Sequence, residues 1–355
     1  MNRSVIYLAI GLLSATLACS ARGQAPRITL NPYEDVDWAQ HERHYGNFHT
    51  HTTESDGRQT PADVIDAYHQ IGHDVLALTD HDTVTWPWRD FGRDPEALGM
   101  IAVPGNELSR HHHTLSLFSE FETDIEDHEV AIQAVDERGG VSVLAHPGRY
   151  WQLEEGQVPN EVRDRYAKLF ESYSSLVGME VVNQEDRYPH DRALWDALLT
   201  ELMPERPVWG MANDDSHRDA HIGRNRTVLL LDEFTDETVR AALEAGRYYF
   251  TKLAGHVEDV REHAQVPTIH RIKHDPDAGT LTAEATLAGK PVSTGAYAWI
   301  SAGGRIVHLG PTLILATTDG LRGYVRLEIR GENGTAFTQP FGLESGDPPT
   351  NDQPE

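Results

Sequence analysis

The 355-residue sequence contains a single cysteine, and its 30 lysine and arginine residues are outnumbered by 56 aspartates and glutamates. With one cysteine the chain cannot form an internal disulfide, although the compartment inferred below would permit one. The formal net charge of −26 argues against a nucleic acid polymer as a partner, because so acidic a surface repels phosphate backbones. The sequence thus excludes a disulfide scaffold and disfavours a protein that binds DNA or RNA.

A long apolar run occurs at the N-terminus, over residues 5–17. It is too short for a stable membrane span and is typical of an export signal. Cys19 follows the run in a pattern that resembles a bacterial lipoprotein processing site, with Thr16 where leucine is usual. We therefore expect a signal peptide over residues 1–23 and an exported, periplasmic or outer-membrane-anchored protein with a lipid on Cys19. Ordinary cleavage near Ser20, without a lipid, is the alternative.

Residues 45–252 alternate short apolar runs with helical patterns. Thr60 and Pro61 supply an N-cap and a first helical position for a helix that ends at Gly72. Apolar runs such as DVLALTDHD, which end in charge, are typical of buried parallel strands. Alternating strands and helices predict a parallel sheet with helices outside it, and seven or eight such strands fit a closed or distorted barrel. The polar residues 24–44 before this region are predicted to be a linker.

The pattern changes after about Lys252. Segments such as TLTAEATL and YVRLEIR alternate apolar and polar residues with a period of two, which is typical of half-buried antiparallel strands. We expect a small antiparallel β-sandwich-like module over residues 255–343. Residues 344–355, rich in proline and aspartate, are predicted to be a disordered tail.

Histidines and carboxylates gather where the apolar runs end. His49 and His51 are separated by one residue, so an extended backbone points both imidazoles to one side. In an α/β barrel the carboxyl ends of the strands form the active site, which is where most of this set falls. Histidine and carboxylate ligands without cysteine suit Zn, Mn or Fe, and about ten ligands imply two to three divalent ions. The candidate metal ligands are His49, His51, Asp56, His81, Glu107, His113, His146, Asp215 and His217.

Six motifs, HTHTTESDG, LTDHD, GNELS, HTLSLF, LAHP and NDDSH, follow one another over roughly residues 45–252. In this order they resemble the polymerase and histidinol phosphatase (PHP) family. The resemblance implies a distorted (β/α)7 TIM-like barrel with metal ions at its mouth. It assigns the ligands to three ions: the first takes His49, His51, Glu107 and Asp215; the second takes Glu107 as a bridge with His113 and His146; the third takes Asp56, His81 and His217.

Two of the candidate ligands are preferred to chemically similar residues beside them. Within the run of histidines at 111–113, His113 is preferred because it directly precedes an apolar strand. Asp215 is preferred to Asp214 because it forms an Asp-x-His pattern with His217. Asp80 is a candidate for orienting a ligand or a water.

Three arginines are candidates for binding a substrate phosphate. Arg149 follows the LAHP motif and is the first candidate for a phosphate clamp, because a guanidinium fork matches phosphate oxygens. Arg110 and Arg224 are weaker candidates. For each, the alternative is a surface arginine paired to one of the many carboxylates.

Clustered divalent ions activate water and neutralise charge on phosphoryl oxygens. The sequence contains neither a Gly-x-Ser-x-Gly nucleophile motif nor a Walker loop, so attack by water is favoured. We therefore expect a metal-dependent phosphoesterase acting on a small phosphate ester. The alternatives are a carbamate, ester or amide hydrolase on the same metals, and a non-enzymatic envelope-binding protein whose barrel is a relic.

Overall fold

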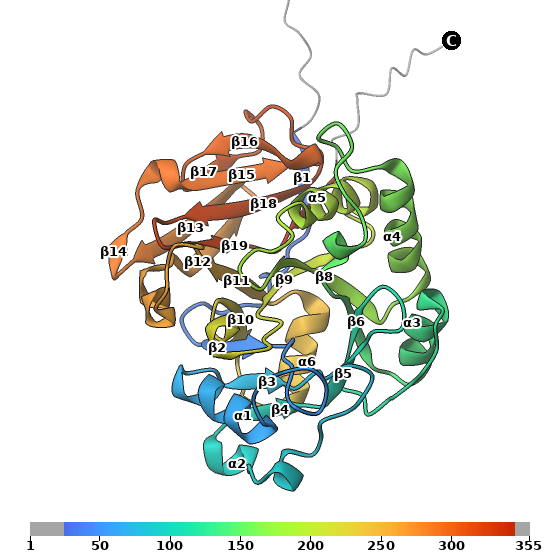
Figure 1. The fold of residues 1–355 in the computed structure, drawn as a ribbon. Helices are drawn as coiled ribbons and strands as arrows, with labels where there is room; N and C mark the ends of the chain where they lie inside the picture. The colour runs from blue at the N-terminus through green and yellow to red at the C-terminus, as the bar shows by residue number, and fades with distance from the viewer. Residues whose placement is uncertain (1–24, 345–355) are drawn as a thin grey trace, which may run out of the picture.

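The computed structural model describes residues 25–344. The predicted signal peptide with Cys19 and the tail after Glu344 lie outside the described residues. No helix between residues 25 and 344 is long and apolar enough to cross a membrane. The described chain is a mixed α/β fold (Figure 1).

The first helix shows how local sequence sets an element. In α1 (Pro61–Gln70) the Thr60 side chain accepts a hydrogen bond from the Asp63 backbone N–H, and proline occupies the first turn. The chain leaves the helix through Gly72, whose φ of 78° favours glycine. Val64, Ile65 and Tyr68 are the buried face of this helix. The predicted helix and its cap are therefore confirmed.

The strands of residues 45–252 form two groups. Three parallel strands begin the first: β2 (Glu42–Asn47), β3 (Val75–Ala77) and β4 (Ile101–Val103). The second is a five-stranded sheet: β5 (Gly105–Leu108), β6 (Thr114–Leu117), β7 (Val141–Leu144), β8 (Leu176–Asn183) and β9 (Trp209–Asn213). The other helices are α2 (Pro95–Leu98), α3 (His128–Glu137), α4 (Asn160–Ser172), α5 (Asp191–Leu202) and α6 (Asp236–Ala245). In Figure 1, α3 and α4 flank one side of these strands, and α1 and α2 lie at the opposite lower corner.

The predicted distorted (β/α)7 barrel is not confirmed, because these strands form two sheets rather than one continuous ring. The break between β4 and β5 falls at Pro104, which has no N–H to donate to a ladder. Two isolated bridges, Thr50 with Ser216 and His81 with Glu107, connect segments of the two groups. Both sheets contribute to one apolar cluster that includes Val75, Val103, Leu115, Val143 and Met211.

The expectation of an all-parallel sheet is wrong for β6. This strand is antiparallel to both β5 and β7, whereas β7, β8 and β9 are parallel. Residues 109–113, which connect β5 to β6, are too few for the crossover that a parallel pair needs. The reversal has a consequence for the site, because the first residue of β6 lies at the edge where its antiparallel neighbours β5 and β7 end.

The C-terminal region is antiparallel throughout, as the alternating pattern predicted. One sheet holds β12 (Thr268–Asp275), β13 (Thr280–Leu287), β14 (Lys290–Pro291) and β17 (Thr312–Ile314). The remaining strands are β15 (Tyr297–Ser301), β16 (Arg305–Leu309), β18 (Gly323–Arg330), β19 (Gly334–Phe337) and β20 (Phe341–Glu344). In Figure 1 the C-terminal strands lie together at the upper left of the molecule.

The predicted sandwich is not confirmed as a separate unit. The strand β19 pairs with β11 (Tyr248–Leu253), and β11 pairs with β10 (Asn225–Leu231), which pairs with β2. A single eleven-stranded sheet therefore runs from β4 into the C-terminal region. Residues of the predicted linker also belong to this sheet, because β1 (Arg27–Leu30) pairs with β20 and Tyr33 is buried in the shared core.

Candidate metal centre

All nine side chains predicted as metal ligands come together in the structure. They come from the ends of several strands: His49 and His51 follow β2, His81 follows β3, His146 follows β7, and Asp215 and His217 follow β9. Glu107 lies within β5, and His113 directly precedes β6. Because β6 runs antiparallel to its neighbours, that first position lies at the same edge as the others.

The first group has the spacing of ligands around one ion. His49 Nε2 lies 3.1 Å from His51 Nε2, 3.2 Å from Glu107 Oε1 and 3.4 Å from Asp215 Oδ1. His51 Nε2 lies 3.1 Å from Asp215 Oδ1 and 3.4 Å from Glu107 Oε2. Ligands about 2.0–2.2 Å from one ion stand roughly 3–3.5 Å apart, so these side chains fit a mixed N/O metal site.

Glu107 presents its two oxygens to different neighbours. Its Oε1 lies 2.9 Å from His113 Nδ1 and 3.0 Å from His146 Nε2, while its Oε2 lies 2.9 Å from His81 Nδ1. Burial alone would raise the pKa of Glu107, but the imidazoles of His49, His113 and His146 hold it well below its usual range. A buried carboxylate that stays charged and faces two sides can bridge two ions.

The third group is more open than the others. Asp56 Oδ1 lies 3.3 Å from His217 Nε2, 3.7 Å from His81 Nε2 and 3.8 Å from His51 Nδ1. The Asp56 side chain is 55% exposed, whereas those of His49, His51 and Glu107 are completely buried. His51 therefore stands between the first and third groups, with one ring nitrogen toward each.

The hydrogen bonds of His49 indicate that the site fits a cation. Its Nδ1 donates to Glu180 Oε1 at 2.8 Å, so the lone pair of a neutral ring lies on Nε2, facing Glu107 and Asp215. Burial lowers the pKa of His49, but Glu107, Glu180 and Asp215 outweigh it and raise the pKa well above its ordinary value. The cluster therefore attracts positive charge to its centre.

Two buried atoms also indicate that the cluster suits a cation. Glu107 Oε2 and His81 Nδ1 lie 2.9 Å apart, yet neither has a partner in hydrogen-bond geometry among the described residues. These two atoms face a common point rather than each other, which is the arrangement of two ligands around one metal ion. The residues present therefore fit divalent ions.

Glu180, which lies within β8 and is fully buried, is a site residue that the sequence did not predict. Besides the bond from His49, its carboxylate accepts hydrogen bonds from the His146 backbone N–H at 2.9 Å and from the side-chain amides of Asn183 and Asn213 at 2.9 and 3.0 Å. A carboxylate on the outer nitrogen of a metal-ligating histidine fixes the tautomer and the ring orientation. The available signal was a single glutamate inside the apolar run VGMEVVN.

Asp80 lies outside the four groups of potential ligands. Its carboxylate accepts hydrogen bonds from the Thr52 N–H at 2.7 Å and from the hydroxyls of Thr52, Ser55 and Thr85 at 2.8, 2.6 and 2.5 Å. These contacts hold the turn that carries Asp56. The structure thus places Asp80 where it supports a ligand-bearing loop.

Asp214 turns away from the ligand groups that contain Asp215. Its carboxylate accepts hydrogen bonds from the Tyr68 hydroxyl at 2.8 Å and from the Gly223 and Asn225 backbone N–H groups at 2.6 and 2.8 Å. Burial raises the pKa of Asp214 to about 7. Of the two neighbouring aspartates, the structure therefore places Asp215 in the cluster.

The backbone is strained beside the ligands. His146 and Asp215 have φ values of 28° and 44°, and Gln184, which donates to the Asp215 carbonyl at 3.0 Å, has a φ of 50°. Residues other than glycine adopt positive φ values at a cost of about 1–3 kcal/mol each, and such residues concentrate at functional sites. The surrounding contacts hold the ligands in positions that an unconstrained chain would avoid.

The arginine candidates differ in position. Arg149 lines the ligand-bearing cavity, which has a volume of about 390 Å³. Arg110 instead pairs with Asp82 at 3.1 Å, and buried Arg224 donates to the carbonyls of Val257 and Ala254. Arg187, which the sequence analysis did not select, also lines the ligand-bearing cavity.

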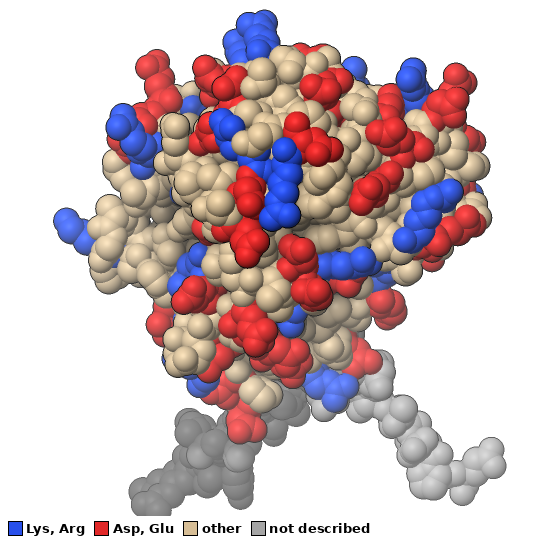
Figure 2. Space-filling model, turned by 90° about the horizontal axis from the view of Figure 1, so that it is seen from below, with Lys and Arg blue, Asp and Glu red and all other residues tan. Residues whose placement is uncertain are grey.

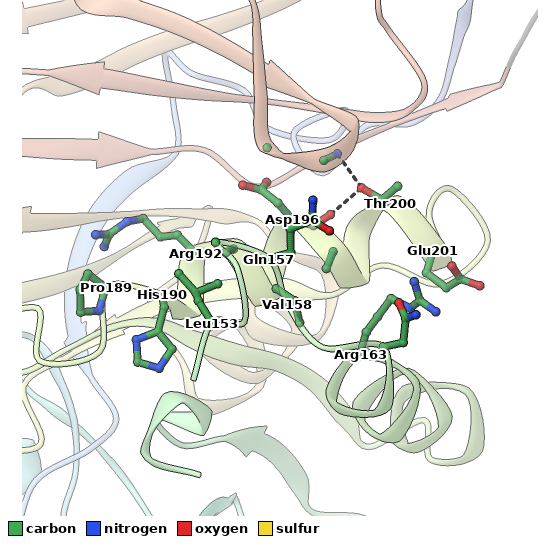
Figure 3. Close-up of a pocket in the computed structure, with 16 residues that line it drawn as sticks. Leu153, Gln157, Val158, Arg163, Pro189, His190, Arg192, Asp196, Thr200 and Glu201 are labelled. Atoms are coloured by element: carbon green, nitrogen blue, oxygen red, sulfur yellow. Dashed lines mark hydrogen bonds between the residues drawn. The ribbon is translucent and has the colours of Figure 1, made fainter. Parts of the chain in front are cut away.

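A larger cavity of about 880 Å³ lies apart from these ligands, between α4, α5 and the loop Ala302–Gly304 (Figure 3). Three of its four charged side chains already have ion-pair partners: Arg163 pairs with Asp164, Arg192 with Asp186, and Asp196 with Arg326. Thr200 closes one side by accepting a hydrogen bond from the Gly303 N–H at 2.9 Å and donating to the Asp196 carbonyl at 2.6 Å. This cavity holds none of the predicted ligands.

The surface charge agrees with the acidic composition. Figure 2 shows acidic and basic side chains interspersed on one face, without a continuous basic area. A nucleic acid polymer needs such an area to neutralise several phosphates at once. This face therefore offers no basic track for a polymer.

No protein-family model matches the chain, and no curated protein matches it. Among solved structures, a two-domain protein from Bacteroides vulgatus, described as containing a predicted PHP-like metal-dependent phosphoesterase, is 17% identical, with 90% of this chain and 99% of that chain covered and a TM-score of 0.47. An amidohydrolase from Chromobacterium violaceum, with bound sulfate and no metal, is 18% identical, with coverages of 48% and 87% and a TM-score of 0.37. A lesion-specific endonuclease from Pyrococcus furiosus is 15% identical, with coverages of 57% and 56% and a TM-score of 0.39. The first bears the family name suggested by the six sequence motifs.

Proposed function

We propose that this protein is an exported metal-dependent phosphoesterase that activates water for attack on a small phosphate ester. The observation that carries the proposal is the convergence of nine histidine and carboxylate side chains, seven of which line one cavity, with Glu107 turned toward two sides. Export and a lipid on Cys19 are part of the proposal and rest on the N-terminal sequence.

The residues that would hold the ions follow from the distances. His49, His51, Glu107 and Asp215 would hold the first, Glu107 with His113 and His146 the second, and Asp56 with His81 and His217 the third. Divalent ions bound there supply Lewis acidity, which activates water and offsets the charge that builds on phosphoryl oxygens. Zn, Mn and Fe are the candidates for this donor set.

The remaining residues bind and orient. The guanidinium of Arg149 lines the same cavity and can hold two phosphate oxygens through its fork of donors. Glu180 fixes the ring of His49 and the backbone of His146. Asp80 fixes the turn of Asp56, so the ligands stand in place before substrate arrives.

Metal analysis combined with a substrate panel tests the proposal. The purified protein is analysed for bound metal and then assayed with p-nitrophenyl phosphate, bis-p-nitrophenyl phosphate and a naphthyl carbamate, with Mn or Zn added. We expect bound divalent metal and turnover of a phosphate ester, with Glu107→Gln lowering the metal content and reducing activity by about 100-fold or more. The matched control Glu171→Gln, on the exposed face of α4, should change neither.

The other outcomes separate the alternatives. Turnover of the carbamate alone would make the protein a carbamate or ester hydrolase on the same site. A protein that neither contains metal nor gains it on incubation would be a non-enzymatic binding protein. Cell fractionation with Cys19→Ser tests the lipid anchor, because the variant should leave the membrane fraction if Cys19 is lipidated.

A further inference from the structure

The ligand-bearing cavity adjoins a second pocket of about 540 Å³. Arg187 and His217 line both, so a molecule at the ligand groups can extend directly into this second pocket. We call it the arginine pocket, because its seven lining residues include three arginines: Arg58, Gln184, Glu185, Arg187, His217, Arg218 and His221. None of the assigned ligands except His217 belongs to it.

The three guanidiniums come from segments far apart in the sequence. Arg58 lies in the turn after β2, Arg187 follows β8, and Arg218 follows β9. Over residues 25–344 none of the three has a carboxylate within ion-pair distance, although the chain contains 56 acidic residues against 30 lysines and arginines. Glu185 is the one carboxylate that lines the pocket. Three positive charges around a single negative one leave the pocket positive.

Backbone contacts fix where the side chains of Arg58 and Arg187 start, and a side-chain contact holds the guanidinium of Arg218. The Arg58 N–H donates to the His217 carbonyl at 3.0 Å, and the Arg187 N–H donates to the Asn183 carbonyl at 3.1 Å. The Arg218 Nε donates to His221 Nε2 at 2.8 Å. The backbones of Arg58 and Arg187 are thus tied to the segments that carry ligands or end a core strand.

The carboxylate next to Arg187 is engaged elsewhere. Asp186 pairs with Arg192 at 2.6 Å and with Lys252. Burial alone would raise the pKa of Asp186, but these two cations lower it, so the carboxylate stays charged and held by them. Asp186 is therefore not available to pair with Arg187, whose side chain lines both cavities.

We propose that the arginine pocket binds a second phosphate group of the substrate, so that the substrate class is a small bisphosphate with one ester at the ligand groups. This inference rests on the proposed function and deepens it. Guanidinium forks match phosphate oxygens in pairs, and a dianion suits three arginines opposed by one glutamate better than a monoanionic carboxylate does. A small molecule is favoured over a polymer, because the net charge of −26 repels an extended phosphate backbone.

The kinetic test compares bisphosphates with monophosphates. Phosphate release is measured for α,ω-alkanediol bisphosphates of increasing chain length, for the matching alkyl monophosphates, and for ω-carboxyalkyl phosphates. We expect kcat/KM for one bisphosphate length to exceed that of its monophosphate by about tenfold or more, and to exceed that of the carboxylate analogue. Arg58→Met and Arg218→Met should each reduce the bisphosphate-to-monophosphate ratio by about tenfold. The control Arg271→Met, an exposed arginine of β12, should leave the ratio unchanged.

Calorimetry separates this inference from the proposed function. The preferred bisphosphate, or butane-1,4-diol bisphosphate if no ester is turned over, is titrated into the Ca²⁺-loaded protein and the Arg58→Met and Arg218→Met variants. Weaker binding in both variants supports the arginine pocket even if the protein is no phosphoesterase. Equal binding in all forms overturns the inference. Two kinetic results would also overturn the inference in a protein that still hydrolyses p-nitrophenyl phosphate. One is a bisphosphate-to-monophosphate ratio of kcat/KM near one at every chain length, and the other is a preference for an oligonucleotide.

Discussion

Glu180 contacts no candidate ion position directly, yet it holds two of the candidate ligands, His49 and His146. Its four hydrogen bonds join His49, the backbone of His146, Asn183 and Asn213, and so connect β8 to the segments on both sides. The bond from His49 Nδ1 decides the tautomer, and through it the lone pair offered at Nε2. A neutral, isosteric replacement changes that electrostatic role while keeping the volume.

Glu180→Gln should therefore weaken metal binding. Each carboxylate oxygen accepts two of the four hydrogen bonds, so the amide NH₂ group must face two donors, and the orientation of His49 or His146 is disturbed. Loss of such an outer carboxylate typically costs about 10–100-fold in metal affinity. Competition between the protein and a chelating dye for Zn or Mn measures the change. Glu126→Gln, at an exposed position, is the matched control, and equal affinities in the two variants would contradict the assigned role.

The candidate ligands could be predicted from the sequence because each belongs to a short, local pattern. His113 illustrates this: the other two histidines of the run have separate contacts, His111 with the His112 carbonyl and His112 with the Tyr166 hydroxyl at 3.0 Å. Glu180 and Arg187 could not be found in this way. Their roles arise only when β8 lies between β7 and β9, and a lone glutamate or a loop arginine carries no spacing that would indicate it.

Among the elements, α5 joins the ligand-bearing half to the C-terminal sheet. Asp196 on α5 accepts hydrogen bonds from Arg326 Nε and Nη2 of β18, both at 2.8 Å, and from the Tyr324 hydroxyl at 2.7 Å. Arg326 also donates to Glu328 at 2.9 Å, and its side chain is only 2% exposed. A buried guanidinium needs these acceptors because water cannot replace them.

Asp196→Ala should destabilise the whole protein by about 3–5 kcal/mol, because it leaves part of the buried Arg326 charge without an acceptor. Chemical denaturation measures the unfolding free energy. Arg330→Ala is the control: Arg330 also pairs with Glu328, but its side chain is 53% exposed, so its loss should cost less than about 1 kcal/mol. Similar costs for the two variants would mean that the Asp196 pair does not hold α5 to β18.

For the whole molecule, the sequence predicted the types of element better than their connections. The change from alternating strands and helices to period-two strands was visible after Lys252, and the C-terminal strands are antiparallel as expected. The continuity of the sheet was not visible, because it depends on pairings such as β1 with β20 and β11 with β19 between distant segments. Amphipathic periodicity indicates which face of a strand is buried and does not identify the neighbouring strand.

The same long-range packing buries histidines that take no part in the site, and these should make the fold sensitive to acid. His73 is 1% exposed, and neither of its ring nitrogens has a hydrogen-bond partner among the described residues. Burial first, and then the nearby Arg226, lowers its pKa well below the ordinary value, and the same two causes lower the pKa of His263. Both imidazoles therefore stay neutral in the folded protein at pH values where they are protonated in the unfolded chain.

The sign of the pH dependence follows from proton counting. Below about pH 6.5 the unfolded chain binds more protons at these two positions than the folded protein does, so the unfolding free energy falls as the pH falls. Each histidine contributes up to about 1.4 kcal/mol per pH unit. His49 acts in the opposite direction in metal-free protein: its raised pKa stabilises the fold below pH 6.5, and this contribution is lost as the pH rises through the folded pKa.

Denaturation of metal-free protein between pH 5 and pH 8 measures these contributions, and His73→Gln isolates one of them. We expect the variant to lose stability less steeply below pH 6.5 than the parent protein, by up to about 1.4 kcal/mol per pH unit. Its behaviour above pH 7 should match the parent, because His49 is unchanged. If the two proteins lose stability equally below pH 6.5, His73 is not held neutral in the fold. The site carboxylates Glu107 and Asp215 do not contribute to this slope, because groups with lowered pKa values withdraw stability only below their unfolded-state pKa of about 4.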